Sequence, residues 1–341
     1  MLRDHQAANS AIARPFRWRR IILLLILAGL LALAFLASLA AGSTGMSIGR
    51  ALSLLFNRDG SVDEALIFNV RMPRASLAAL VGVNLAMAGV LIQTLTRNPL
   101  ASPQTFGINA GASVGIVFLA MVFPPFGALG NVIPAFIGAS IVGFIMWALS
   151  LDGKANNMKI ALSGITIQLV LSALIQGVLI ADNSTQDIIF WLVGSVSTAQ
   201  WPKVFIILPF TVIGGIGAIL AARYIGVLAL DRITSQSLGQ YPKNVAALTC
   251  ALILILACPA VAVAGPIGFV GLIVPHIVRF FAGEDQRALL ILSALGGALL
   301  LCSADLAGRV FAYPAELPVG ILTALLGAPA FLIIAARKRV R

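Results

Sequence analysis

Charged residues are scarce in this sequence: they make up 10% of its 341 residues, whereas hydrophobic residues make up 60% and the mean hydropathy is +1.02. This composition excludes a water-soluble globular domain, in which about 25% of residues are charged. Apolar runs of about 20 residues recur along the chain, and a helix of that length crosses about 30 Å of hydrocarbon. The runs do not alternate as the strands of a membrane β-barrel would. The sequence therefore predicts an all-α membrane protein.

Groups that carry enzyme chemistry are also few. The two histidines are His5 and His276, and the three cysteines, Cys250, Cys258 and Cys302, lie in apolar runs at no metal-ligand spacing. The sequence has neither a nucleophile-elbow context nor a Gly-x-x-x-x-Gly-Lys-Ser/Thr loop to cradle phosphate. We expect no catalytic residue, no metal site and no cofactor bound by this chain, and we interpret the cysteines as packing residues and His276 as a hydrogen-bonding residue at a helix bend.

Negative charge is the rarer sign, and the formal net charge is +11. The 23 basic residues are scattered between apolar runs and are not interleaved with aromatic residues on a soluble face. This pattern is typical of membrane orientation and argues against nucleic acid as a partner.

The apolar windows predict about ten transmembrane helices. They cover residues 21–41, 75–96, 105–123, 131–150, 160–181, 203–222, 245–264, 267–281, 288–305 and 317–336. The first window resembles a signal peptide, but it is longer than the usual apolar region of about 7–15 residues, so we interpret it as a retained span. The eighth window is short and contains Pro275, which predicts a broken or tilted helix.

Lysine and arginine gather at both ends of the chain and in alternate loops. With an even number of spans, this distribution places both termini in the cytoplasm. The chain is thus divided into a cytoplasmic leader (1–20), a ten-helix transmembrane domain (21–336) and a basic tail (337–341).

Three arginines depart from this distribution, because the topology places Arg71, Arg74 and Arg309 at the external face. Helix-end arginines commonly reach lipid phosphates, which is one interpretation. The other is an electropositive rim that binds an acidic partner by charge-assisted hydrogen bonds.

The largest polar segment, residues 222–244, joins the sixth and seventh spans on the cytoplasmic side and is interrupted by Gly239 and Pro242. It is either an ordinary surface loop or an element that receives force from a soluble subunit.

The charged residues nearest the spans, Arg279 and Asp305, fall at predicted helix ends, which disfavours coupling of transport to protons or sodium. An energy source outside the chain, such as a separate ATPase, fits better.

Uncharged polar residues do lie within the predicted spans. They provide either hydrogen bonds between helices or the lining of a path for a large hydrophilic solute. The candidates for the path are Asn84, Gln93, Gln168 and Gln176.

Four sequence blocks carry a resemblance to a known family. They are Arg71-Met72-Pro73-Arg74, the segment 93–107 with Asn98-Pro99-Leu100, the segment 265–276, and Glu316-Leu317-Pro318-Val319-Gly320 followed by Gly327-Ala328-Pro329. In these blocks the chain resembles the FecCD-type permeases over about residues 70–335. Those permeases are the membrane subunits of type II ABC importers for iron-siderophore complexes, haem and vitamin B12.

The resemblance implies the type II ABC importer permease fold and a set of partners. A second permease subunit, identical or homologous, would complete a dimer that opens inward and outward. Two cytoplasmic ATPase subunits would bind ATP and Mg, and a periplasmic or lipid-anchored solute-binding protein would deliver the substrate.

The resemblance also implies roles for individual residues, each placed on the matching position of this chain. The positions that would receive glutamates of the binding protein are Arg71, Arg74 and Arg309. The positions that would form the cytoplasmic gate are Asn98, Leu100, Ser163 and Gly164. The positions of the loop that would contact the ATPase are Asp231, Arg232, Ser237, Leu238 and Gly239, where Arg232 stands in place of the acidic residue common in relatives.

We therefore expect the permease subunit of an ATP-driven importer of an iron(III)-siderophore complex, in the bacterial cytoplasmic (inner) membrane. Haem or cobalamin is the alternative substrate within the same family. An ion-coupled secondary transporter and a structural membrane scaffold are the alternatives from other classes.

Overall fold

The computed structural model describes residues 2–41, 46–122, 132–151, 157–181, 192–228 and 242–338. Ten long or apolar helices in these ranges correspond one to one with the ten predicted spans. They are α1 (Leu2–Ala40), α4 (Met72–Thr96), α5 (Ile108–Val122), α6 (Val132–Leu151), α7 (Asn157–Ala181), α9 (Trp201–Val227), α11 (Pro242–Ala264), α12 (Val270–Ala282), α13 (Gln286–Phe311) and α14 (Val319–Lys338). Six of them are long and apolar enough to cross a membrane, and the other four contain shorter apolar helices.

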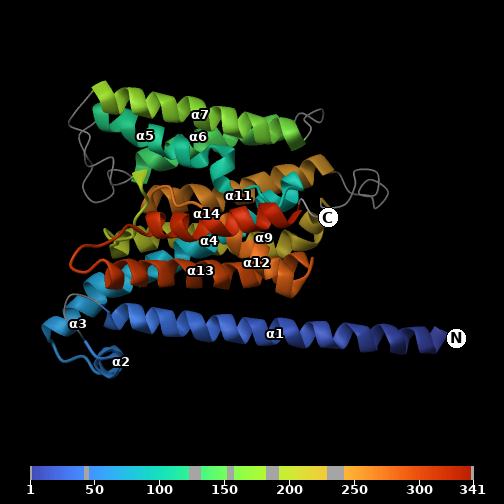
Figure 1. Cartoon of the computed structure of the whole chain (residues 1–341), viewed down its shortest axis with the longest axis horizontal. Coiled ribbons are helices and arrows are strands. Elements are labelled where there is room, and N and C mark those ends of the chain that lie inside the picture. The colour runs from blue at the N-terminus through green and yellow to red at the C-terminus, as the bar shows by residue number, and fades with distance from the viewer. Residues whose placement is uncertain are drawn as a thin grey trace.

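Both termini lie toward one end of the helix bundle, as an even number of spans requires (Figure 1). We call this the cytoplasmic end. The opposite, external end carries the short helices α2 (Ile48–Phe56) and α3 (Val62–Leu66), followed by the π-helix η1 (Ile67–Arg71).

Helix α4 forms the centre of the bundle, because α9, α11, α12 and α13 all pack against it. Glycine makes the closest of these contacts possible. A Cβ atom on Gly82 would lie 2.2 Å from the carbonyl oxygen of Gly297 in α13, and one on Gly89 would lie 1.9 Å from that of Gly271 in α12. Helices pack this closely only where small residues face one another. Gly111 and Gly115 of α5 likewise pack against the backbone of α6.

Helix α1 lies along one edge of the bundle, and α7 lies along the opposite edge beside α5 and α6 (Figure 1). Much of the apolar surface of α1 is exposed, but arginines attach the helix to the bundle at two places. Near the middle of α1, at the cytoplasmic end of the bundle, Arg20 donates to Asp285 (Nη1–Oδ2 2.7 Å) and to the carbonyl oxygen of Ala282 (3.1 Å). At the external end of α1, Arg71 and Arg309 donate to backbone carbonyl oxygens.

The eighth helix is short, as predicted. Helix α12 has 13 residues, which span about 20 Å and therefore less than the hydrocarbon thickness. The segment before it contains two residues with positive φ, Gly265 (75°) and Phe269 (67°), and the Phe269 ring packs on Gly327 of α14. Pro275 lies within the helix, so the interruption falls before α12 and not at the proline.

Candidate functional site

The three predicted docking arginines meet at the external end. Arg71 is the last residue of η1, Arg74 lies in the first turn of α4, and Arg309 lies in the last turn of α13. Their exposed fractions are 5%, 7% and 9%, so the three side chains are buried within the chain. The sequence interpretations both directed these side chains outward, whereas the structure directs them toward acceptors inside the protein.

Two of the arginines bind the external end of α1. Arg71 Nη1 donates to the carbonyl oxygens of Leu39 (2.7 Å) and Ala40 (2.9 Å). Arg309 Nη1 donates to those of Ser38 (3.1 Å) and Ala41 (3.0 Å), and its Nη2 donates to the Ser38 hydroxyl. The last four carbonyl groups of a helix have no partner within the helix, and a cation there also interacts favourably with the helix dipole. Arg71 and Arg309 therefore cap α1, a role that sequence reasoning missed.

A buried carboxylate joins the other pair of arginines. Asp305 accepts from Arg74 Nε (3.0 and 3.1 Å) and pairs with Arg74 Nη2 (2.9 Å) and Arg309 Nη2 (3.1 Å). The sequence prediction placed Asp305 at a helix end, but α13 continues to Phe311, so the carboxylate lies inside the helix. A buried charge must be paired to be tolerated, and two guanidinium groups satisfy this requirement. In the sequence, this pairing could have been inferred from the four-residue spacing between Asp305 and Arg309, because residues four apart lie on the same face of a helix.

Arg74 also binds a second carboxylate, that of Glu316 in the loop between α13 and α14. Its Oε2 lies 2.8 Å from Arg74 Nη1, and its side chain is 48% exposed. We use the name arginine cluster for Arg71, Arg74, Arg309, Asp305 and Glu316.

The predicted gate begins with the turn after α4. Asn98 is exposed, and its Oδ1 accepts from the backbone N–H of Leu100 (3.0 Å), while its carbonyl oxygen accepts from that of Ala101 (3.1 Å). Arg97 before it adopts a left-handed conformation (φ 51°) and donates from Nε to the carbonyl oxygen of Leu228 (2.8 Å). The turn is therefore attached to the end of α9.

The second predicted gate element lies next to this segment. Ser163 is half-buried and Gly164 is buried near the start of α7. Helix α7 packs on the 3₁₀ helix η2 (Pro103–Phe106), where a Cβ atom on Gly164 would lie 2.3 Å from the carbonyl oxygen of Thr105. The structure thus brings the two segments into contact, and their role as a gate stays a prediction.

The predicted ATPase-contacting positions lie outside the described residues, which end at Leu228 and resume at Pro242. They are Asp231, Arg232, Ser237, Leu238 and Gly239.

The four candidate path residues fall into two separate pairs. Asn84 and Gln93 are buried in the central helix α4, whereas Gln168 is half-buried and Gln176 exposed on the peripheral helix α7. Gln93 Nε2 donates to the carbonyl oxygens of Gly271 (3.3 Å) and Leu272 (3.4 Å), which is the interhelical bonding considered as the alternative. Within the part of the chain that the structure describes, the Asn84 amide has no hydrogen-bond partner.

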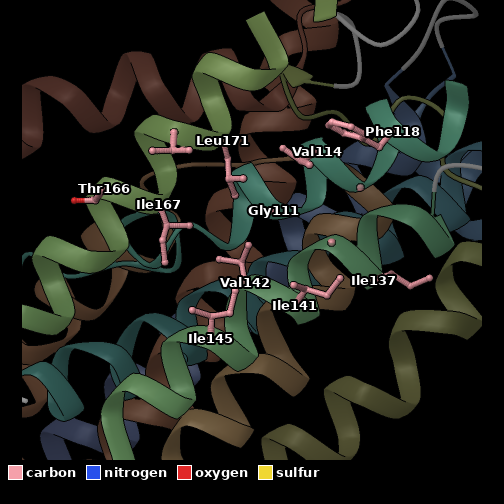
Figure 2. A pocket seen from close by; sticks show the side chains of 13 residues that line it. Gly111, Val114, Phe118, Ile137, Ile141, Val142, Ile145, Thr166, Ile167 and Leu171 are labelled. Carbon is pink, nitrogen blue, oxygen red and sulfur yellow. The ribbon is translucent and has the colours of Figure 1, made fainter. Parts of the chain in front are cut away.

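A cavity of about 470 Å³ between α5, α6 and α7 has an almost wholly apolar lining (Figure 2). Its hydroxyl group, that of Thr166, donates to the carbonyl oxygen of Leu162 (2.9 Å) in the same helix. The lining residues that Figure 2 labels offer no charged group to a hydrophilic chelate. Among the described residues there is also no group of three or more His, Cys, Asp or Glu side chains that could hold a metal ion.

The arrangement of helices matches that of a solved ABC transporter. The structure of an inward-facing metal-chelate type ABC transporter superposes with a TM-score of 0.82 at 28% identity, covering 92% of this chain and 98% of that chain. The chain thus has the fold of a type II ABC importer permease. The model of the FecCD transport family matches residues 30–337, and the chain belongs to this family.

Relatives in this family carry different substrate names. The chain is 43% identical over 302 residues to the Fe(3+)-citrate import system permease protein YfmD of Bacillus subtilis (strain 168), covering 89% of this chain and 90% of the relative. It is 40% identical over 323 residues to the hemin transport system permease protein HmuU of Yersinia pestis (90% and 94% covered). It is 37% identical over 282 residues to the cobalamin import system permease protein BtuC of Halobacterium salinarum (82% and 75% covered). The chain is therefore an ABC importer permease and a multi-pass protein of the cytoplasmic membrane.

Proposed function

We propose that this permease translocates an iron(III)-siderophore complex. The observation that carries the proposal is the 43% identity with a permease named for Fe(3+)-citrate import, over nine-tenths of both chains. The similarity to a metal-chelate type transporter supports the same substrate class. Haem and cobalamin remain the second candidates, because permeases named for them are 40% and 37% identical.

The proposed complex contains this chain, a second permease subunit that is identical or homologous, two ATPase subunits and an external solute-binding protein. ATP and Mg would be bound by the ATPase subunits. The binding protein would dock at Arg71, Arg74 and Arg309, which lie together at the external end and carry more positive than negative charge when Asp305 and Glu316 are included. Complementary charge of this kind accelerates and orients docking.

The cytoplasmic half of the proposed mechanism uses the segments at the other end of α4. Closure of the ATPase subunits on ATP would move the loop at 222–244. The attachment of Arg97 to Leu228 supports a connection between the base of this loop and the turn at Asn98 and Leu100. The contact of Gly164 with Thr105 supports a joint movement of α7 and η2 at the gate.

The substrate is tested by ligand-stimulated ATP hydrolysis in the complete complex, reconstituted in lipid with its ATPase and binding protein. We expect stimulation by ferric siderophores and inhibition by vanadate. Stimulation by haem or cobalamin in place of ferric siderophores would contradict the proposed substrate and support the second candidates.

A further inference from the structure

Arg74 divides its donors between two acidic residues with different environments. Nε and Nη2 bind Asp305, whose side chain is 3% exposed, whereas Nη1 binds Glu316, whose side chain is half-exposed. One side of the guanidinium group is thus held inside the bundle. The other side binds a half-exposed side chain from the external loop.

We propose that Glu316 is an internal substitute for the carboxylate of an acidic partner protein. It occupies Nη1 of Arg74 in the free permease, and the partner's carboxylate displaces it on docking. This inference rests on the proposed docking function of the arginine cluster and adds a competitor within the chain.

The two ion pairs of Arg74 differ in how easily they can be exchanged. A solvent-exposed pair contributes little to stability, because water and dissolved ions compete for both groups. A buried pair resists separation, because the remaining charge would be left without a partner at low dielectric. Glu316 can therefore leave Arg74 readily, while Asp305 stays between Arg74 and Arg309 as their permanent counter-charge.

Space for an incoming side chain lies next to Glu316. A cavity of about 610 Å³ at the external end is lined by Arg309, Glu316, the end of α1 and the start of α2. Within the described residues, the buried Nε of Arg309 has no hydrogen-bond acceptor. The N–H of Leu317, next to Glu316, donates to the carbonyl oxygen of Gly308 (3.3 Å), which attaches this part of the loop to α13. The exchange requires rotation of the Glu316 side chain.

The charges of the cluster favour an acidic occupant. Arg74 and Arg309 pair with Asp305, and Arg74 also pairs with Glu316, whereas Arg71 binds backbone carbonyl oxygens of α1. When Glu316 turns into solvent, Arg74 and Arg309 share the single carboxylate of Asp305, so one positive charge remains uncompensated beside the cavity. A glutamate or aspartate from an extracytoplasmic protein matches this site, and a basic or neutral side chain does not.

The test measures the affinity of the complete transporter, in lipid nanodiscs, for the solute-binding protein that supports ATP hydrolysis in the reconstitution above. Because the competitor is removed, Glu316→Gln should lower the dissociation constant by about two- to fivefold. Glu316→Ala should shift it in the same direction. Glu64→Gln is the matched control: it removes one external negative charge, but its remaining oxygen can still accept from the N–H groups of Asp59 and Gly60.

Tighter binding by both Glu316 variants, with the control unchanged, is the expected result. Unchanged or weaker binding by both variants, while the wild type binds and Arg74→Glu does not, would overturn this inference and leave the proposed docking function intact. If the binding protein does not bind the wild type, the docking function fails, and this inference fails with it.

Discussion

The two ends of α4 are held by different kinds of contact. At the external end, Arg71 and Arg74 bind residues of α1, α13 and the last loop through charge-assisted hydrogen bonds. At the cytoplasmic end, the turn at Asn98 is closed by neutral hydrogen bonds between near neighbours, and one charge-assisted hydrogen bond, from Arg97 to the carbonyl oxygen of Leu228, attaches it to the end of α9. Breaking a buried charge pair is far more costly than breaking one neutral hydrogen bond. This contrast agrees with a rigid recognition site outside and a rearranging turn inside.

The largest expected effect concerns the carboxylate at the centre of the arginine cluster. Asp305→Asn leaves Arg74 and Arg309 without their buried counter-charge, and loss of one partner of a buried pair costs about 3–5 kcal/mol. We expect a much lower thermal unfolding temperature in detergent or nanodiscs. Glu316→Gln removes an exposed partner of the same Arg74 and should leave that temperature nearly unchanged. Equal unfolding temperatures of Asp305→Asn and the wild type would show that the cluster is not a stability centre.

The next effect separates docking from stability. In Arg71→Glu/Arg309→Glu, the affinity for the binding protein should fall by about 2–5 kcal/mol, the usual range for truncating one partner of a buried charge pair in an interface. The structure adds that both residues also cap α1, so the variant should be compared with Arg71→Lys/Arg309→Lys, which retains the charge. Equal affinity of wild type and the glutamate variant would reject the docking assignment.

The third prediction concerns the packing of α4 against α13, between the external and cytoplasmic ends of α4. Gly82→Ala places a methyl group 2.2 Å from the carbonyl oxygen of Gly297 and forces α4 and α13 apart. Overpacking of this kind costs about 1–3 kcal/mol, which a thermal unfolding curve detects. Gly177→Ala in α7 is the control, because no neighbouring atom lies within 4 Å of the added methyl group. A loss of stability in the control equal to that of Gly82→Ala would argue against the close contact.

The turn at the cytoplasmic end should respond more weakly. Asn98→Ala removes the hydrogen bond to the Leu100 N–H, which is worth about 0.5–1.5 kcal/mol. We expect unchanged affinity for the binding protein together with altered substrate leak or altered ATP hydrolysis without substrate. A docking defect as large as that of the arginine variant would contradict the assignment of separate roles to the two ends.

The smallest effect is a pH dependence in the external loop. Hydrogen bonds from Ser61, with a further contribution from Arg50, lower the pKa of Asp59 to about 2. Because the folded-state pKa is depressed, the loop is stabilised above the ordinary aspartate pKa of about 3.9, and this stabilisation is lost as the pH falls toward 2. Hydrogen exchange of the Ser61 amide should therefore become faster over this interval, corrected for the intrinsic exchange rate. Ser61→Ala should reduce the pH dependence.

The order and approximate positions of the ten helices could be predicted because apolar runs of membrane length are a local property of the sequence. The end of the ninth helix was misplaced for the same reason: Asp305 and Arg309 interrupt the apolar window although they lie within α13. The ion pair between Asp305 and Arg309 lowers the cost of burying these charges within the helix. An average of hydropathy over a window of residues does not report whether two charges pair.

The candidate site was only partly predictable. Sequence topology brought Arg71, Arg74 and Arg309 to one face, but Arg74 meets Asp305 and Glu316 across 231 and 242 residues. Those contacts depend on the close packing of α4 against α13, where Gly82 faces Gly297. The same limitation applies to Asn84 and Gln168, which share a polar character in the sequence but lie on a central and a peripheral helix.

The proposed import of an iron chelate, driven by ATP hydrolysis on partner subunits, is tested most directly by the uptake of radioactive iron. The iron is presented as a ferric siderophore with the binding protein to proteoliposomes that contain the complete complex. We expect accumulation that requires ATP at the ATPase subunits and stops with vanadate. Uptake that continues without ATP and collapses when an ion gradient is removed would contradict it.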